Sequence, residues 1–295
     1  MTATIPSYPA VRPPELADRA LLQERLSILQ PVVSELCFAN LVLFRHVHRY
    51  TISMVNNSLI IFGCGYDGIP YFLPPLSGER GETACRLLDE GRLLFGADEQ
   101  FIERYLAGRD YLITPDRDND DYLYLRREMA ALTGSRFHAK KNRINHFAAR
   151  QNYWVEPYSA NHQAAALQLL ERWQAGHGDN GSRSFEAEVA ANREGLLNAS
   201  SVGLTGVVVL TDQGVAGFAL GSRLNNMTAV CLFEKADPGL EGAAQLVNRE
   251  FSRYQPVEML YINRQQDLGH AGLRRAKSSY HPVRMVRKFK VARVS

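Results

Sequence analysis

The sequence predicts an α+β protein of two domains, each a mixed, mostly antiparallel sheet flanked by helices. Three observations lead to this prediction. A chain of 295 residues is long for one domain and sufficient for two hydrophobic cores. Helical and strand periodicities alternate along it, and from Tyr153 the order reads β-α-α-β-β-β-α-β-α-β. Because no Gly/Ser-rich or Pro-rich linker divides the halves, we expect packed domains at residues 1–150 and 151–295.

Apolar periodicity and turn residues define the elements of the first half. Residues 49–63 read as two strands around an Asn-Asn turn, and residues 68–76 read as a third strand. The acidic run at residues 116–121 resembles a calcium loop but lacks the glycine and the distal glutamate of an EF-hand, so we expect a solvated turn. Apolar residues at helical spacing predict helices over residues 15–29, 81–96, 97–108 and 135–151.

The second half follows the same rules with clearer signals. Three antiparallel strands are expected within residues 204–237, with turns at Asp212–Gly214 and Leu224–Asn226. The remaining strands are expected at residues 153–159, 257–264 and 284–294, and the helices at residues 160–176, 185–200, 243–254 and 272–280.

Composition constrains the class of protein more than its partners. A net charge of +3 is too small to indicate a partner, and no apolar run approaches the roughly 20 residues of a membrane span. The N-terminal residues show neither a basic n-region nor an apolar h-region, so we expect no signal peptide and a cytoplasmic, soluble protein. The cysteines have no metal or CxxC spacing, and we expect them to be reduced core residues: Cys37, Cys64, Cys85 and Cys231.

Four stretches resemble a known family. They are residues 134–147, 233–237, 242–248 and 263–282, the last of which is long and specific. They are similar to the soluble C-terminal domain of phosphatidylglycerol lysyltransferase. The resemblance covers most of the chain and implies tandem GNAT-like (acyl-CoA N-acyltransferase-like) domains, the second of which holds the acyl-transfer channel. The membrane relatives use aminoacyl-tRNA as donor and a lipid head group as acceptor. We expect no membrane half in this chain, so the lipid acceptor is not implied.

Two positions depart from the expected patterns. CoA-using GNAT proteins typically carry Q/R-x-x-G-x-G/A before a helix whose backbone N–H groups hold the pyrophosphate. Here Gly239 replaces the Gln or Arg, whereas Gly242 and Ala244 fit and are candidate donor-binding residues. Gln265 stands where the family pattern N-R-E-x-D-L-G has an acid. The first departure weakens acyl-CoA as donor, and the second removes one candidate carboxylate.

Residues 263–280 supply the groups that acyl transfer requires: donors for an oxyanion, a proton acceptor and a proton donor. Asn263 and Arg264, at the carboxyl end of a strand, would polarise or position the donor carbonyl. Asp267 would engage the nucleophile, although an N-cap role suits it equally. Tyr280 stands where many GNAT enzymes carry the tyrosine that protonates the leaving group, and packing is its alternative role.

Charged residues around this stretch are candidates for donor binding. The resemblance favours Lys277 as a cation that holds an anionic part of the donor, although a solvated helix face would look the same. Glu234 and Lys235 end the preceding strand and would lie near the same opening in the sheet. A solvated strand end is the alternative for both.

The predicted helix over residues 135–151 carries a basic stripe. Arg136, Lys140, Arg143 and Arg150 follow one another at spacings of 4, 3 and 7 residues and therefore share a face. Such a stripe suits a phosphate-rich partner, either an RNA acceptor arm or an anionic head group. The solvent face of a connecting helix would have the same composition.

These observations favour an acyl- or aminoacyl-transferase. The donor would be aminoacyl-tRNA or acyl-CoA, and an amine or hydroxyl of a small molecule or a lipid head group would attack its carbonyl directly. Lys277 and the basic stripe would hold the phosphates of the donor. A non-catalytic ligand- or RNA-binding protein that retains the fold is the alternative. No metal site is expected, because His46 and His48 have no third ligand at a suitable spacing.

Overall fold

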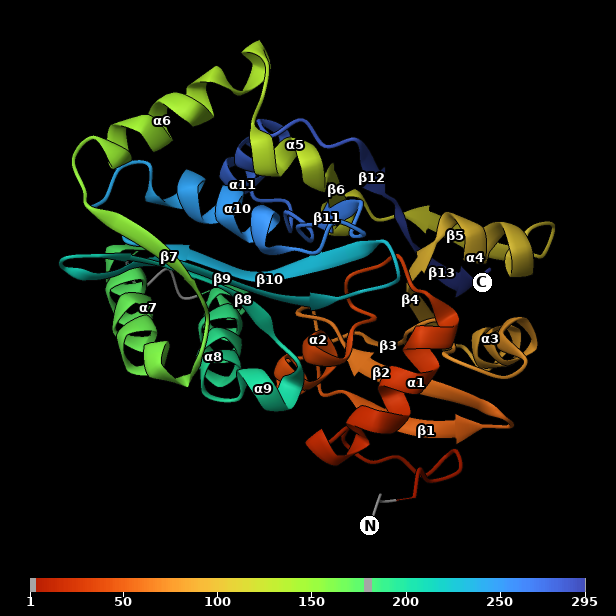
Figure 1. The fold of residues 1–295 in the computed structure, drawn as a ribbon. Coiled ribbons are helices and arrows are strands. Elements are labelled where there is room, and N and C mark those ends of the chain that lie inside the picture. Colours follow the sequence, from red (N-terminus) through yellow and green to blue (C-terminus); the bar gives the residue numbers. More distant parts are fainter. Residues whose placement is uncertain (1–3, 178–181, 295) are drawn as a thin grey trace. The chain divides into compact units, whose positions relative to one another are not determined.

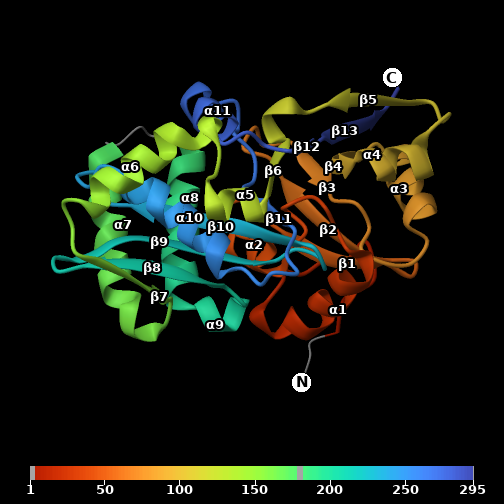
Figure 2. The ribbon, with the colours of Figure 1, turned by 45° about the horizontal axis from the view of Figure 1, so that its top comes forward.

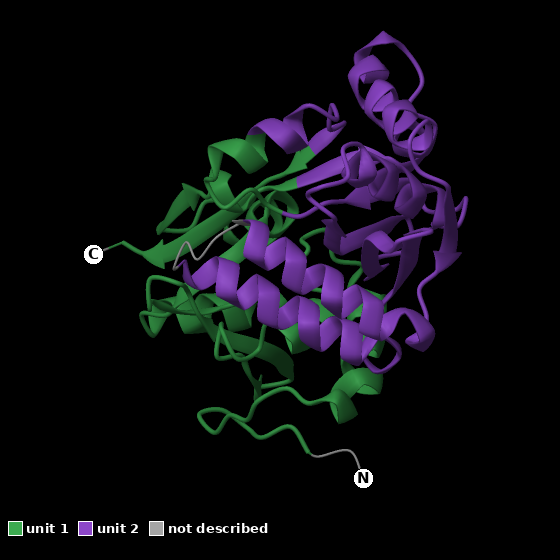
Figure 3. Ribbon diagram, turned by 90° about the vertical axis from the view of Figure 1, so that its left-hand side faces the viewer, with its two compact units in different colours: residues 1–121, 266–274, 285–295 green, residues 122–265, 275–284 purple. Residues whose placement is uncertain are grey.

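A computed structural model describes residues 4–177 and 182–294 of the chain. The chain divides into two compact units, which Figure 3 draws in different colours. Unit 1 comprises residues 1–121, 266–274 and 285–295, and unit 2 comprises residues 122–265 and 275–284. This division differs from the expected boundary at residue 150, because the last strand returns to unit 1 and the basic helix belongs to unit 2.

Unit 1 is built on a sheet of order β1-β2-β3-β4-β13-β5 (Figure 1). Its apolar core joins Phe72 of the sheet to Leu87 and Leu88 of a helix and to Val291 of the last strand. The elements are η1 Leu16–Asp18, α1 Arg19–Leu29, α2 Phe38–Leu43, β1 Thr51–Val55, β2 Ser58–Cys64, β3 Pro70–Phe72, α3 Arg80–Asp89, β4 Leu93–Asp98, α4 Glu99–Phe101, the π-helix η2 Ile102–Leu106, β5 Tyr111–Pro115, η3 Arg117–Asn119 and β13 Lys288–Arg293.

Unit 1 departs from the predicted elements in several places, and α2 and β5 lie where no element is expected. The helix expected over residues 81–96 ends at Asp89, and its last third forms β4. Gly91 there adopts φ +81°, which ends the helix, and β4 then pairs with β13 from the other end of the chain. His46 and His48 lie in a turn after α2, and the half-buried His48 ring contacts the Cys64 carbonyl through Nδ1 at 3.3 Å.

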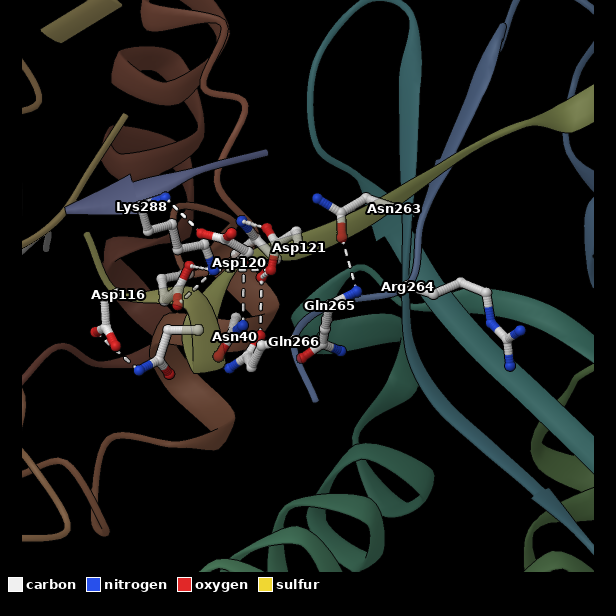
Figure 4. Close-up of polar contacts among 12 residues, drawn as sticks. Asn40, Asp116, Asp120, Asp121, Asn263, Arg264, Gln265, Gln266 and Lys288 are labelled. Atoms are coloured by element: carbon white, nitrogen blue, oxygen red, sulfur yellow. Dashed lines mark hydrogen bonds and ion pairs between the residues drawn. The ribbon is translucent and has the colours of Figure 1, made fainter. Parts of the chain in front are cut away.

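A buried ion network lies at the end of the unit 1 core (Figure 4). Lys288 Nζ donates to both Glu35 oxygens, at 2.8 and 2.7 Å, and to Asp121 Oδ1 at 2.7 Å. Asp121 also accepts from the backbone N–H and hydroxyl of Ser34 at 2.7 and 2.9 Å. Burial lowers the pKa of Lys288, but the two carboxylates raise it by more. The net pKa is therefore raised, and the ammonium remains charged.

Unit 2 is built on a sheet of order β12-β6-β11-β10-β9-β8-β7. Helix α10 covers one face of this sheet together with α5 and α6, and α7 and α8 cover the other (Figures 1 and 2). The elements are β6 Asp121–Leu125, α5 Arg126–Ala131, η4 Ser135–Phe137, α6 His138–Ala148, β7 Tyr153–Pro157, η5 Ala160–His162, α7 Gln163–His177, α8 Arg183–Leu197, α9 Ala199–Val202, β8 Thr205–Thr211, β9 Gly214–Arg223, β10 Thr228–Ala236, α10 Ala243–Tyr254, β11 Tyr261–Asn263, α11 Ala271–Ser278 and β12 Arg284–Val286.

The predicted α+β class is confirmed, and so is the order of elements after Tyr153. The strand expected over residues 257–264 is shorter, because a turn in which Met259 N–H donates to the Pro256 carbonyl precedes β11. The final strand of the predicted order continues from β12 into β13, which pairs with β4 and β5. Local periodicity therefore predicted the strand but not the sheet to which it belongs.

The sheet of unit 2 parts between β10 and β11. These parallel strands pair through Thr228–Tyr261, Ala229–Ile262 and Val230–Asn263. Beyond these pairs β11 ends, whereas β10 continues to Ala236 and shifts register against β9 between Cys231 and Phe233. The second half of β10 therefore keeps β9 on one edge and loses its strand partner on the other.

Helix α6 packs closely against the N-terminus of α10. Gly242 at that position adopts φ +93°, and a Cβ there would lie 2.0 Å from the Arg143 carbonyl oxygen and 3.0 Å from Phe147 Cβ. Only glycine combines this left-handed backbone with such a close approach. Gly242, at the start of α10, is therefore covered by α6 of the same unit.

We expect Gly242→Ala to lower the free energy of unfolding by about 3 kcal/mol, because a left-handed alanine and an overpacked contact each cost about 1–2 kcal/mol. The control is Gly134→Ala, at φ +90° with nothing within 4 Å of the added Cβ. It should cost only the conformational term. Urea denaturation of both variants measures the difference, and equal losses would show that α6 does not press on Gly242.

Candidate functional site

Arg264 follows β11 directly and reaches the part of β10 that β11 leaves unpaired. Its Nη2 donates to Glu234 Oε1 at 2.9 Å, and its guanidinium lies 5.1 Å from the centre of the Tyr280 ring. Only 14% of its side chain is exposed. Its Nη1 is buried and has no hydrogen-bond partner among the described residues. Because an unpaired buried donor is costly, Nη1 marks a position at which an oxygen of a ligand would be stabilised.

The neighbours of Arg264 keep it charged. Burial alone would lower the pKa of the guanidinium, but Glu234 and the phenol groups of Tyr124 and Tyr280 raise it, and the net pKa is raised. Arg264 is therefore a permanent cation in a largely desolvated place. Such a cation stabilises a developing negative charge more strongly than an exposed one.

A second unpaired group lies on the other side of Glu234. Asn248 of α10 donates from Nδ2 to Glu234 Oε2 at 2.8 Å, and its Oδ1 is buried without a hydrogen-bond partner in the part of the chain that the structure describes. Each oxygen of the Glu234 carboxylate therefore accepts one hydrogen bond, from Arg264 or from Asn248. Each of these residues, Arg264 and Asn248, keeps one buried polar atom unused.

A turn of three residues positions Arg264, and Figure 4 shows its hydrogen bond from Gln265 to Asn263. Asn263 Oδ1 is fully buried and accepts from the Gln265 N–H at 2.7 Å. Lys277 Nζ donates to the carbonyls of Arg264 and Gln265 at 2.6 and 3.2 Å, and Tyr124 donates its hydroxyl proton to the Lys277 carbonyl at 2.8 Å. Asn263 and Lys277 therefore hold the backbone that aims Arg264.

Tyr280 lies between two cations. Lys140 Nζ is 4.2 Å from the centre of the Tyr280 ring and donates to Ser279 Oγ at 2.6 Å. Burial, and then the charges of Arg143 and Arg264, lower the pKa of Lys140. Burial raises the pKa of Tyr280, although Arg264 partly opposes this. The Tyr280 hydroxyl makes no hydrogen bond within residues 4–177 and 182–294 and stays protonated at neutral pH.

Glu234 and Lys235 lie on opposite faces of β10, as consecutive strand residues must. Whereas Glu234 meets Arg264, Lys235 forms an ion pair with Glu188 and lies 3.7 Å from the centre of the Trp173 ring on the face of α7 and α8. The structure therefore does not bring Lys235 to the Arg264 site.

Asp267 belongs to unit 1, whereas Arg264 belongs to unit 2. Its fully buried carboxylate accepts from Arg274 at 3.0 and 2.9 Å, from Arg117 at 3.3 Å, and from the Gly269 N–H at 2.9 Å. Helix α11 begins only at Ala271, so Asp267 closes a turn before the helix. Its oxygens are engaged in supporting this segment.

The N-terminus of α10 is the place at which a CoA pyrophosphate would be expected. Gly242 there lies against the Arg143 carbonyl of α6, and Ala244, two residues further along, is exposed. Of the basic stripe, Arg136 pairs with Glu128 at 2.6 Å, whereas the exposed Arg143 makes no ion pair among the described residues. Lys140 lies over the Tyr280 ring, and the charges of both Arg143 and Arg264 act on Lys140.

Sequence reasoning missed Asn248 and Tyr124. Asn248 lies on the buried face of α10 between Val247 and Phe251, and a polar residue on an apolar face is a signal that could have identified it. Tyr124 lies between two leucines in β6, so the sequence pattern predicts only that its side chain is buried. Its hydroxyl contact with the backbone of α11 follows from the fold alone.

Within the described residues, all cysteines are free, and no three His, Cys, Asp or Glu side chains gather closely enough to hold a metal ion. None of the helices that the structure describes has the length and apolar character needed to span a bilayer.

Comparisons with known proteins find solved structures of similar fold. A crystal structure of a conserved protein of unknown function from Bacteroides thetaiotaomicron is 27% identical, with a TM-score of 0.88 over 96% of this chain and 99% of that one. The C-terminal domain of a putative lysylphosphatidylglycerol synthetase from Agrobacterium fabrum is 10% identical, with a TM-score of 0.63 over 95% and 93%. L-PGS from Bacillus licheniformis is 13% identical, with a TM-score of 0.60 over 99% and 94%. No curated protein matches the chain.

The last two likenesses are too low in identity to show more than the fold, which is a GNAT-like α+β fold. The family model that matches this chain supports a function of the acyl- or aminoacyl-transferase type. The family model described as phosphatidylglycerol lysyltransferase, C-terminal, matches residues 26–292. Since this match spans nearly the whole chain, the protein belongs to the phosphatidylglycerol lysyltransferase C-terminal family.

Proposed function

We propose that unit 2 transfers an aminoacyl group from an ester donor of the aminoacyl-tRNA class to an amine or hydroxyl acceptor. The observation that carries this proposal is the buried, unpaired Nη1 of Arg264 beside the parted strands. A donor carbonyl placed there would gain a charge-assisted hydrogen bond that strengthens as its oxygen becomes an oxyanion.

The reaction requires three roles, which the site residues supply. The nucleophile attacks the ester carbonyl, forming the new C–N or C–O bond while Arg264 holds the oxyanion. Glu234, the carboxylate that contacts Arg264, accepts the proton that the nucleophile loses. When the ester C–O bond breaks, Tyr280 gives its hydroxyl proton to the leaving oxygen, and solvent returns a proton from Glu234 to Tyr280. Asn263 and Lys277 position Arg264, and Asp267 supports the segment that follows.

Lys140 and Arg143 are assigned to the phosphate of the donor nearest the scissile ester. Lys140 lies over the ring of Tyr280, the leaving-group acid, and the Arg143 charge acts on both residues. A nucleotide ester places a phosphate close to the leaving oxygen, which suits this order. CoA is disfavoured as donor because α6 covers Gly242 and the expected Gln or Arg is Gly239.

The donor class can be tested with tRNA charged in turn with each amino acid and hydroxylamine as a small nucleophile. Transfer is followed as aminoacyl hydroxamate above the uncatalysed rate, and acyl-CoA is assayed in parallel. We expect turnover of charged tRNA and none of acetyl-CoA. Turnover of acyl-CoA alone would overturn the donor assignment. Equal thermal stabilisation by charged and deacylated tRNA without turnover would favour an RNA-binding protein, the role that the basic stripe of α6 suggests.

The pH dependence follows from the raised pKa of Tyr280. Since burial raises this pKa above the ordinary value near 10, the phenol keeps its proton to a higher pH than a free tyrosine. We expect Tyr280→Phe to lower kcat about 10²-fold, and the wild type to show no loss of acid catalysis below about pH 10. The control is Tyr254→Phe, an exposed tyrosine at the end of α10. An unchanged kcat in Tyr280→Phe would remove this residue from the mechanism.

A further inference from the structure

The edge of β10 that β11 leaves unpaired is held by a side chain. Gln265 Nε2 donates to the carbonyl oxygens of Cys231 and Leu232, at 3.0 and 3.1 Å. These two carbonyls belong to the register shift of β10, directly beyond the last pair with β11. The amide of Gln265 therefore spans the opening where a longer β11 would have supplied backbone N–H groups.

The conformation of Gln265 is enforced by its surroundings. Its φ of +56° lies in the left-handed region, which costs a non-glycine residue about 1 kcal/mol or more. Asn263 Oδ1 accepts from its N–H, and Lys277 Nζ donates to its carbonyl. A strained residue that is fixed by two buried side chains has its amide placed with little freedom.

These hydrogen bonds also determine which way the amide faces. Because Nε2 must donate to Cys231 and Leu232, Oε1 is turned away from β10. Oε1 accepts no hydrogen bond within residues 4–177 and 182–294. Gln265 thus presents one fixed, neutral acceptor at the opening, and the side chain of the preceding residue, Arg264, extends away from it (Figure 4).

We propose that Gln265 Oε1 recognises the α-amino group of the aminoacyl donor. This inference rests on the proposed function and extends it, because it makes Gln265 the residue that distinguishes aminoacyl esters from simple acyl esters. A glutamate at this position would still accept from an ammonium, but when ionised it has no N–H to donate to the β10 carbonyls.

The test is a double-mutant cycle with two non-hydrolysable probes. These are 3′-alanylamido-3′-deoxyadenosine and 3′-propionylamido-3′-deoxyadenosine, which differ only in the α-amino group. The wild type should bind the alanyl probe about tenfold more tightly, as expected for one charge-assisted hydrogen bond. In Gln265→Ala the ratio should fall to about one, with the affinity for the propionyl probe unchanged. Gln265→Met, which has a similar length but no amide oxygen, should lose the preference in the same way, and it serves as the test if the alanine variant does not fold.

The outcomes distinguish a failure of this inference from a failure of the proposed function. If both probes bind the wild type and the ratio stays the same in Gln265→Ala, Gln265 merely joins the strands and the inference is overturned while the proposed function stands. If neither probe binds the wild type, both the proposed function and the inference fail. Gln255→Ala, another largely buried glutamine of unit 2, controls for a general loss of packing and should leave the ratio unchanged.

Discussion

Replacing Lys288 with methionine is expected to lower the free energy of unfolding by about 3–5 kcal/mol, because it leaves two buried carboxylates without their cation. Lys288 Nζ contacts Glu35 and Asp121 within 2.8 Å, and its side chain is fully buried. Methionine has a similar length and keeps most apolar contacts. The loss therefore measures the ion network and not a cavity.

The loss should also depend on pH. Burial raises the pKa of Glu35, and Lys288 lowers it; without Lys288 this pKa rises further. A carboxyl group whose pKa is raised in the folded state favours folding while it is protonated, and this contribution disappears as pH rises through the folded pKa. Lys288→Met should therefore be less destabilised at pH 5 than at pH 8.

Urea denaturation at both pH values measures this prediction. Lys290→Met is a matched control in the same strand, because Lys290 is 39% exposed and pairs with Asp116 at 3.2 Å. It should change stability by less than about 1 kcal/mol. Adding Glu35→Gln to Lys288→Met should recover part of the loss, since one buried charge is removed. If Lys288→Met behaves like Lys290→Met, the network contributes nothing to the stability of unit 1.

Replacing Arg264 with lysine is expected to lower kcat for aminoacyl transfer about 10²- to 10³-fold, with little change in the KM of the donor. A lysine ammonium can satisfy Glu234, but it has no second planar N–H group to occupy the position of Nη1. The effect falls on kcat because an oxyanion donor acts mainly in the transition state.

The matched control is Arg249→Lys. Arg249 pairs with Glu250 at 2.7 Å, with 16% and 13% of the two side chains exposed, close to the values of 14% and 18% for Arg264 and Glu234. The two substitutions should therefore alter stability by similar amounts, while only Arg264→Lys alters kcat. Equal activity of both variants would show that Arg264 has no role in the reaction.

Several features of the site follow from the sequence. A polar stretch directly after a predicted core strand, and its resemblance to a family motif, pointed to Asn263, Arg264, Lys277 and Tyr280, and the structure places these residues together. Turn residues also predicted the hairpins of β1–β2 and of β8–β10. These features depend on neighbours in the chain, so local pattern is sufficient to find them.

The role of each of these residues depends on its tertiary contacts. Asn263 and Lys277 have the chemistry of catalytic groups, but their polar atoms bind the backbone around Arg264. Lys235 faces the helices α7 and α8, and Asp267 is held by two arginines in unit 1. Residue type gives the chemistry of a side chain, whereas its partners depend on elements far away in the sequence.

The sequence by itself determined the α+β class, the order of elements after Tyr153 and the stretch that forms the site. Only the tertiary structure decided that β13 joins the sheet of unit 1, that α6 covers Gly242, and that Gln265 spans the opening beside β10. The physical reason is that periodicity records which face of an element is buried, but not what buries it. Strand pairing, close helix contacts and the pairing of buried polar atoms join residues that are far apart in the sequence, so they depend on the whole fold.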